Sequence, residues 1–164
     1  MNDQTLTTSD SLMENQIIEN ELRSFIGEKS NYYFFKWGIS ENPGKYARWN
    51  WSAFICGVFW MGYRKMYKEL FVCTIILFLL DITILSVTND YFDKIMSYVV
   101  ASIIGTYGNA IYYNYVQRSM NKIKEQNEID KIKSIRKKGG TSFVGVIIAL
   151  LLYFGFRVIY SYVG

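Results

Sequence analysis

Three long apolar runs dominate the second half of the chain and alternate with short polar stretches. They are Leu70–Thr88, Ile95–Val116 and Thr141–Val163. At ~1.5 Å per helical residue they would extend over roughly 28–34 Å, which matches a hydrocarbon core of ~30 Å. The pattern therefore predicts an all-α membrane protein with three transmembrane helices, over 70–88, 95–117 and 141–163.

The chain before these runs is polar at its start and becomes aromatic toward residue 37. Residues 1–10 hold nothing to bury and are expected to form a disordered tail. Ser11–Ile26 carries apolar residues at helical spacing, and the aromatic stretch Asn31–Trp37 follows it. These features predict a short amphipathic cytoplasmic arm over 11–45. The arm is expected either to pack on the membrane core or interface, or to offer a groove to a partner.

A short tryptophan-rich segment opens the membrane domain, which is expected to cover 46–164 after the turn at Ser40–Gly44. A helix over 49–63 would be only ~22 Å long, which is short for a membrane span. We interpret it as one re-entrant or interfacial helix, and the alternative is a genuine first span. Tryptophan favours the water–lipid boundary. The predicted interface anchors are therefore Trp49, Trp51 and Trp60.

Basic residues cluster at two places that border the apolar runs. Arg64, Lys65 and Lys68 precede the first run, and residues 118–140 before the last run are expected to form a basic cytoplasmic loop. By the positive-inside rule both places face the cytoplasm. A re-entrant 49–63 then puts the N-terminus in the cytoplasm and the C-terminus outside, whereas a spanning 49–63 puts both termini outside.

The most basic part of this loop has two interpretations. Five cations lie just before the last run: Lys131, Lys133, Arg136, Lys137 and Lys138. They either fix the orientation alone, or also bind anionic lipid headgroups or an acidic partner. Juxtamembrane cations attract anionic lipids by about 1 kcal/mol each. The expected partners are therefore membrane lipids and either another membrane protein or a second copy of this chain.

The composition of the chain argues against several kinds of partner and site. Much of the net charge of +4 lies next to the apolar runs, which argues against nucleic-acid binding. Histidine is absent and the two cysteines form no Cys-x-x-Cys pair, so no metal, cofactor or catalytic site is predicted. Residues 1–24 lack the basic start and apolar core of a signal peptide. Abundant Ile, Lys, Asn and Tyr is typical of AT-rich bacterial genomes, and we expect a multi-pass protein of the bacterial cytoplasmic membrane.

Asp81 is the one acidic residue inside the three apolar runs. A charge near the middle of the bilayer costs at least ~2.5–3.5 kcal/mol unless it is paired or neutral. Arg157 is expected at a similar depth in the last run, so we predict an intramembrane ion pair between Asp81 and Arg157. The alternatives are two independent groups, or a proton or ion pathway that also uses polar residues of the second run. Those residues are Tyr98, Ser102, Thr106 and Tyr107.

Two pairs of small residues are spaced four apart within the apolar runs, Ala101 with Gly105 and Gly145 with Ala149. Such pairs let two helix backbones approach closely. They are expected to serve packing within the monomer or, alternatively, dimerisation.

Several short blocks in the middle of the chain resemble the DUF2628 family of small bacterial membrane proteins. The most specific are Trp49-Asn50-Trp51 and Tyr63-Arg64-Lys65-Met66-Tyr67. Phe25-Ile26-Gly27 and Gly108-Asn109 with Tyr112 are similar as well, whereas Val58 stands where members often have proline. The resemblance implies a cytoplasmic head followed by a compact cluster of membrane helices, and it brings no assigned activity.

These observations favour a non-enzymatic role. We expect a small integral membrane protein that is an accessory or regulatory partner of a larger membrane protein. The alternative is a small oligomeric transport or ion-conducting unit centred on Asp81.

Overall fold

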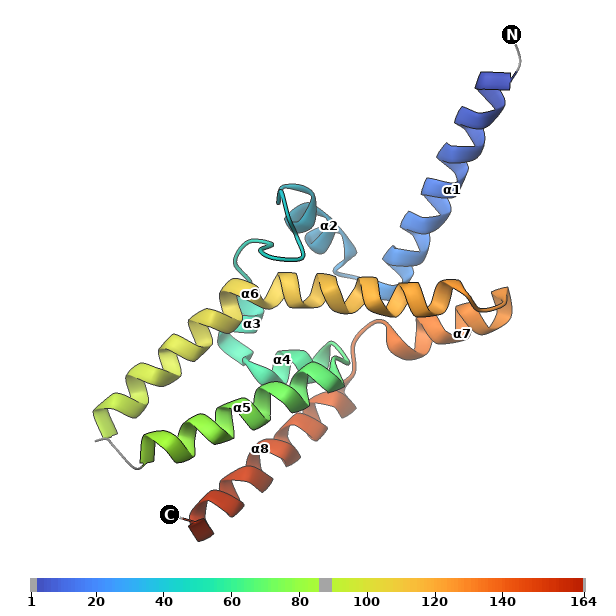
Figure 1. Cartoon of the computed structure of the whole chain (residues 1–164). Helices are drawn as coiled ribbons and strands as arrows, with labels where there is room; N and C mark the ends of the chain where they lie inside the picture. Colours follow the sequence, from blue (N-terminus) through green and yellow to red (C-terminus); the bar gives the residue numbers. More distant parts are fainter. Residues whose placement is uncertain (1–2, 86–89, 164) are drawn as a thin grey trace.

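The computed structural model describes residues 3–85 and 90–163 (Figure 1). Over these residues the secondary structure is helical and contains no strand, which confirms the all-α part of the expected class. The helices are α1 (Asp3–Ile26), α2 (Ser30–Gly38), α3 (Trp51–Cys56), α4 (Val58–Tyr63), α5 (Tyr67–Leu85), α6 (Asp90–Lys124), α7 (Glu128–Lys138) and α8 (Phe143–Val163). The last part of the predicted span 70–88, from residue 86, lies outside the described residues.

The helices form two parts that share α6. In the first part, which we call the body, α5, α8 and the first half of α6 (90–108) extend in one direction, with α3 and α4 packed between them (Figure 1). In the second part, the head, α1, α2 and α7 pack around the second half of α6 (109–124). The two ends of the chain lie far apart, because α1 projects from the head and α8 ends at the far end of the body.

The first helix starts earlier than expected. α1 begins at Asp3, so the prediction of a disordered tail over 1–10 is wrong from residue 3 onward. Adding a residue to an existing helix forms one hydrogen bond for each residue fixed. The stretch 3–10 contains no proline or glycine that would stop this extension.

The arm is not amphipathic along its whole length. Leu12, Met13 and Ile18 are all exposed, and at ~100° per residue they lie on different sides of α1. Only the last two turns contact the rest of the chain: Phe25 and Ile26 are completely buried, and Glu21 forms an ion pair with Lys131 of α7. The expectation of one apolar face over 11–26 was therefore wrong, and docking depends on the end of the helix.

The tryptophan-rich segment is two short helices rather than one. Asn50 caps α3 by accepting a hydrogen bond from the Ala53 amide at 3.0 Å. The helix ends at Gly57, whose φ of 53° and ψ of −128° favour a residue without a side chain. α4 starts directly after this break and ends at Tyr63. A single helix over 49–63 was predicted because the sequence pattern does not distinguish a glycine inside a helix from one that ends it.

The expected basic loop 118–140 is largely helical. α6 continues to Lys124, and α7 starts after Asn127, whose side-chain oxygen accepts a hydrogen bond from the Asp130 amide at 2.9 Å. The two glycines after α7 join it to the end of α1, where the Gly140 amide donates to the Phe25 carbonyl at 2.7 Å. The cations of this region are therefore held on a helix that packs on α1 and α6.

Glycines allow the closest helix contacts of the body. A Cβ on Gly62 of α4 would overlap the Gly145 carbonyl of α8, and a Cβ on Gly145 would overlap the Gly62 carbonyl. On α6, a Cβ on Gly105 would lie 2.8 Å from the Phe54 Cβ, and one on Gly108 would lie 2.7 Å from the Ala53 Cβ. Gly105 and Gly145 of the small-residue pairs are thus used for packing within one chain.

Among the described residues, no helix on its own has both the length and the apolar composition needed to cross a bilayer. Glu128–Lys138 and Phe143–Phe156 meet that criterion as a pair, with a bend of 51° between them.

Candidate functional site

A cluster of aromatic rings around Arg64 forms the centre of the molecule, where head and body meet. Arg64 follows α4 and is only 4% exposed. Its guanidinium carbon lies 4.7 Å from the ring centre of Tyr33 and 5.1 Å from that of Tyr112. One guanidinium nitrogen donates to the Ile26 carbonyl at 3.2 Å, at the C-terminal end of α1. Ring faces and a helix C-terminus are both favourable for a cation, so they stabilise this buried charge.

The same cluster leaves two polar atoms without a hydrogen-bond partner among the described residues. They are Nε of Arg64 and the hydroxyl oxygen of Tyr112. Burial raises the pKa of the Tyr33 phenol, while the Arg64 charge acts in the opposite direction. Tyr33 is therefore a neutral ring donor to the cation at physiological pH.

Asn109 links three segments beside this cluster. Its side-chain nitrogen donates to the Ala47 and Arg48 carbonyls, both at 3.1 Å, and its side-chain oxygen accepts from Asn50 at 2.8 Å. Its backbone carbonyl accepts from the Trp37 indole at 3.1 Å. Asn109 is completely buried and thereby fixes α2 and the start of α3 on α6. We call Arg64, Tyr33, Tyr112, Asn50 and Asn109 the hub.

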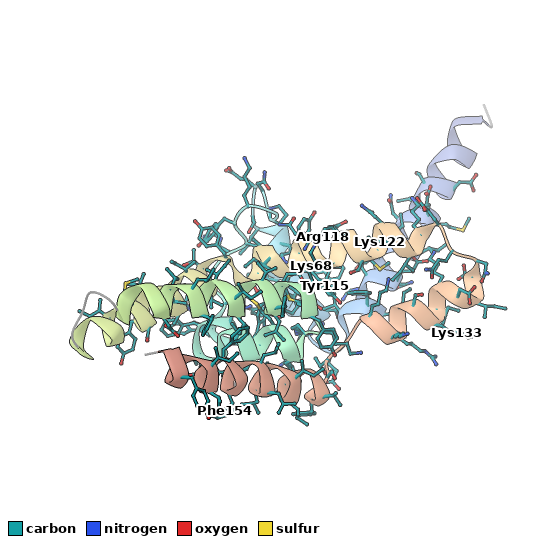
Figure 2. All side chains as sticks on the ribbon, turned by 60° about the horizontal axis from the view of Figure 1, so that its bottom comes forward. Lys68, Tyr115, Arg118, Lys122, Lys133 and Phe154 are labelled. Atoms are coloured by element: carbon teal, nitrogen blue, oxygen red, sulfur yellow. The ribbon has the colours of Figure 1, made fainter. Side chains whose placement is uncertain are left out.

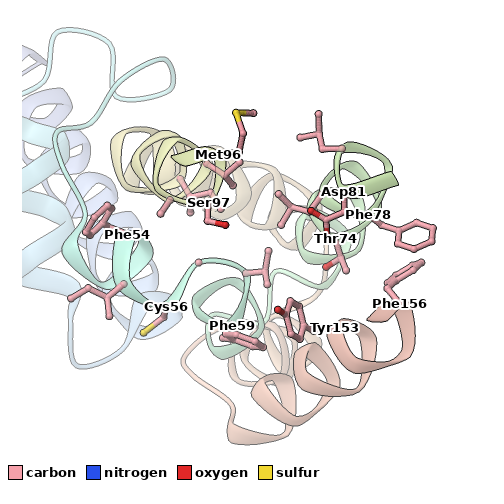
Figure 3. A pocket seen from close by; sticks show the side chains of 18 residues that line it. Phe54, Cys56, Phe59, Thr74, Phe78, Asp81, Met96, Ser97, Tyr153 and Phe156 are labelled. Carbon is pink, nitrogen blue, oxygen red and sulfur yellow. The ribbon is translucent and has the colours of Figure 1, made fainter. Parts of the chain in front are cut away.

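A cleft of about 500 Å³ lies on the other side of α3 and α4 (Figure 3). Its walls come from α5, the first half of α6 and α8, and its inner end from residues 54–59. Most of the lining is apolar. Four polar side chains line it, namely Thr74, Asp81, Ser97 and Tyr153, and Figure 3 shows their oxygens directed toward the open space between the helices.

The hub and the cleft differ in what they can do chemically. The hub is filled by its own side chains and holds the helices together. The cleft is open, falls within the usual size range of ligand pockets and combines apolar walls with a few polar groups. Among the described residues there is no group of acids and cysteines that could hold a metal ion.

The comparison with known proteins concerns the segment that contains the hub. A family described as proteins of unknown function, DUF2628, matches residues 14–118. The chain belongs to the DUF2628 family. No curated protein and no solved structure matches it. α7 and α8 lie beyond the matched residues of this DUF2628 protein, whereas all five hub residues lie within them.

The predicted ion pair between Asp81 and Arg157 is not tested by the described residues. Asp81 lies on α5 at the cleft and has an interaction within the chain. Arg157 belongs to α8, but its side chain lies outside the described part of the chain, so the pair stays a prediction.

The polar residues that were considered for a pathway with Asp81 do not line the cleft. Ser102 and Thr106 donate to carbonyls of their own helix, at 2.8 and 2.7 Å, and Tyr98 and Tyr107 are exposed. The cleft is instead lined by Ser97 from this helix. None of the four residues contributes to this cleft, and a pathway through them and Asp81 stays a prediction.

The five cations of the basic cluster all lie at or near α7. Lys131 forms an ion pair with Glu21 of α1, and the Lys137 carbonyl accepts from the Lys65 side chain at 3.2 Å. Lys133, Arg136 and Lys138 belong to the same helix. Lys131 thus helps to dock α1, and the other four cations are exposed on α7.

The three tryptophans differ in their surroundings. Trp51 is 66% exposed, which fits the predicted place at an interface. Trp49 is half-buried and packs on Trp51 and Phe54. Trp60 is only 4% exposed and lies in the core next to Tyr112, so its predicted role as an interface anchor is wrong. α4 carries Trp60 inward because Gly57 changes the direction of the chain before it.

Arg64 and Asn109 were not identified as site residues from the sequence. Arg64 was interpreted as one of three exposed cations that set the orientation, yet it is buried. Both lie in blocks that carry the resemblance to DUF2628, and this was the available signal. Their roles depend on residues 38 to 72 positions away, which no local pattern reveals.

Proposed function

We propose that this DUF2628 protein is a small integral protein of the bacterial cytoplasmic membrane without enzymatic activity, and that it is an accessory or regulatory partner of a larger membrane protein. In this proposal the body is embedded in the bilayer and the head lies in the cytoplasm.

The observation that carries the membrane placement is the exposed surface of the body. Large apolar side chains are exposed on all three of its long helices: Phe71, Val72, Ile76 and Leu79 on α5, Ile95, Val99 and Ile103 on α6, and Val144, Ile147, Leu151 and Phe154 on α8. Exposed apolar surface of this extent is typical of membrane contact or of a protein interface. Helices that are apolar on every side are buried in a protein or in lipid.

The polar groups of the body are consistent with insertion as a bundle. Lys68 and Glu69 lie in the first turn of α5, at the end of this helix that adjoins the head. Glu69 forms an ion pair with Arg118 of α6, at 2.5 Å. Thr74 is buried and donates to the Leu70 carbonyl at 2.8 Å, and Asp81 lines the cleft. Three helices inserted together would thus shelter polar groups that a lone helix would expose to lipid. α8, with 21 residues, is about 31 Å long and matches the hydrocarbon core.

The charges support an orientation. Figure 2 places Lys68, Arg118, Lys122 and Lys133 at the head and at the adjoining end of α5, and Phe154 directed away from α8 on the body. The positive-inside rule then favours a cytoplasmic head. α5 leaves the head, α6 returns and α8 leaves again, so the C-terminus would lie outside. The short pair α3 and α4 would enter and return on the cytoplasmic side.

The projecting arm supports a protein partner. Four large apolar side chains of α1 are exposed, namely Leu12, Met13, Ile17 and Ile18. They lie on more than one side of a helix that contacts its own chain only near its end. A helix inserted between elements of a larger protein would bury them. This arrangement favours contact with a partner in the cytoplasm, next to the membrane.

The membrane placement is tested by extraction and labelling. In native membranes the full chain should stay in the pellet after alkaline carbonate treatment. A tag at the C-terminus should be accessible only from outside the cell, and one at the N-terminus only after lysis. Release by carbonate would contradict membrane insertion, and accessibility of both tags from outside would contradict the orientation.

The partner is tested by photo-cross-linking from α1. A cross-linker at position 13 should capture one stoichiometric foreign membrane protein. Ile17→Gln should reduce this capture, while Asn20→Gln, an exposed polar position on the same helix, should not. Capture of only this chain itself would argue against an accessory role.

The cleft favours a second function, a small transport or ion-conducting unit centred on Asp81. The Asp81 side chain provides the one carboxylate of the cleft lining and faces an open space among apolar helices. Asp81→Asn should abolish proton or cation flux in proteoliposomes in this case. The same variant should leave cross-linking from α1 unchanged if the first function holds.

A further inference from the structure

We infer that the cleft between α5, α6 and α8 binds a lipophilic organic cation, with Asp81 as its counter-charge. This inference names the ligand class for the second function and depends on that function for its physiological meaning. Binding itself depends only on the cleft and can be measured without any flux.

The cleft has the size and lining of a ligand site. Its volume of about 500 Å³ lies within the 300–1,000 Å³ that small-molecule sites usually have. Residues of five helices contribute to its lining, so a ligand there would contact every element of the body. A small polar solute would leave the apolar walls in contact with water, whereas a molecule with apolar substituents would cover them.

The charge of the lining selects for a cation. Asp81 is the one acidic residue among the eighteen that line the cleft, and none of the eighteen is lysine or arginine. A carboxylate attracts a cation that is brought next to it, and more strongly beside apolar walls than in bulk water. Asp81 keeps an interaction within the chain, so the cation would join or replace that contact.

Aromatic rings favour a cation that is large and diffuse. Phe78 is one helical turn before Asp81, and its ring centre lies 4.8 Å from that of Phe156 on α8. Phe59 of α4 and Tyr153 of α8 form a second contacting pair at one edge of the cleft, with ring centres 5.8 Å apart (Figure 3). Ring faces attract cations, most strongly where water is excluded. A quaternary or aromatic cation would therefore contact these rings and the carboxylate together.

Other ligand classes fit less well. An anion would be repelled by the Asp81 carboxylate, which is the one charged group among the eighteen lining residues. A metal ion prefers several oxygen ligands, and this lining offers one carboxylate with three hydroxyls. An uncharged lipid tail would cover the apolar walls but would gain no electrostatic binding energy from Asp81.

The test uses two ions of the same shape and opposite charge, tetraphenylphosphonium and tetraphenylborate. Their binding to the purified full chain in micelles is measured by equilibrium dialysis, with protein-free micelles as the reference. We expect saturable binding of the phosphonium and at least about tenfold weaker binding of the borate. Asp81→Asn should weaken phosphonium binding about tenfold, the equivalent of about 1.4 kcal/mol. Asp81→Glu should largely retain it.

A matched control removes the same charge elsewhere. Asp10→Asn changes an exposed carboxylate on α1, far from the cleft, and should leave binding unchanged. Equal binding of the two ions, unchanged binding by Asp81→Asn, or no saturable binding of the phosphonium would each overturn the inference. Phosphonium binding without flux would retain the inference and reject the transport function.

A second readout does not require a substitution of Asp81. Cys56 lines the cleft and is exposed, so a maleimide should label it. In a Cys73→Ser background, phosphonium should slow this labelling and borate should not. Labelling that is equally fast with and without phosphonium would contradict binding in this cleft.

Discussion

The side-chain nitrogen of Asn50 donates a hydrogen bond to the side-chain oxygen of Asn109 at 2.8 Å, across 59 residues of sequence. Each asparagine also organises backbone on its own side. Asn50 caps α3, and its backbone amide donates to the Gly105 carbonyl at 2.8 Å. Asn109 binds the two carbonyls that precede Trp49. The pair therefore sets the position of α3 on α6, and with it the inner end of the cleft.

Removal of the Asn109 side chain should destabilise the whole fold. Asn109→Ala leaves the Asn50 side-chain amide and the Ala47 carbonyl, both buried, without this partner. An unsatisfied buried group costs about 1–3 kcal/mol, so we expect a loss of at least about 2 kcal/mol, measured by chemical unfolding in mild detergent. The control is Asn114→Ala on the same helix, which loses one half-buried bond to the Gly44 carbonyl and should cost about 1 kcal/mol. Equal losses for the two variants would contradict the central role of Asn109.

The close contact between Gly62 and Gly145 predicts opposite effects for two glycines of α8. Gly145→Ala places a methyl group against the Gly62 carbonyl and should destabilise the fold by about 1–3 kcal/mol. Gly155→Ala has nothing within 4 Å of the new methyl group and should stabilise α8 by about 0.5–1 kcal/mol. Thermal unfolding followed by circular dichroism would distinguish them. A stable Gly145→Ala variant would show that α4 and α8 can separate at no cost.

Apolar periodicity predicted the all-α class and the positions of α5, α6 and α8, because lengths and composition are local properties. The helix ends were harder to predict. α1 reaches back to Asp3 along a polar stretch, and Gly57 divides a segment that looked continuous. Helix ends depend on how far a helix propagates and on whether a glycine lies inside it or ends it, and neither can be read from the apolar pattern.

The candidate site shows the same limit. Asp81 was identified because a charge inside an apolar run is conspicuous in the sequence. The hydroxyls that share its cleft come from α5, α6 and α8, and no spacing in the sequence brings Ser97 and Tyr153 together. Arg64 stands beside Lys65 in a basic stretch, yet it lies under α1 while Lys65 stays near the surface. Only the tertiary contacts distinguish the two cations.

The buried charge of Arg64 predicts an unusual order of stability among substitutions at this position. Arg64→Lys keeps the charge but loses the planar group between Tyr33 and Tyr112, so a compact ammonium is left in an apolar place. We expect it to cost about 2–4 kcal/mol. Arg64→Met has similar bulk without a charge and should cost less, because apolar replacement of a buried charge is often tolerated.

Chemical unfolding of the two Arg64 variants in the same detergent gives this comparison. Lys65→Met is the matched control, since it removes a neighbouring cation whose hydrogen bond to the Lys137 carbonyl is exposed, and it should change stability by less than about 0.5 kcal/mol. If Arg64→Lys is as stable as the parent and Arg64→Met is not, the charge itself, rather than the shape and ring contacts, holds the hub together.

The raised pKa of Tyr33 predicts a loss of stability in alkaline solution. Burial disfavours the phenolate, so the folded chain keeps this proton at a pH where the unfolded chain has already lost it. The unfolded state then binds fewer protons than the native state, and the free energy of unfolding falls as pH rises above 10. One such proton contributes a slope of at most about 1.4 kcal/mol per pH unit.

Tyr33→Phe has no proton to lose at this position, so its unfolding midpoint should fall less steeply than that of the parent between pH 9 and about 11. Tyr98→Phe, at an exposed tyrosine, should follow the parent curve. Parallel curves for the parent and Tyr33→Phe would mean that the phenol titrates as it does in the unfolded chain, and that the hub admits water.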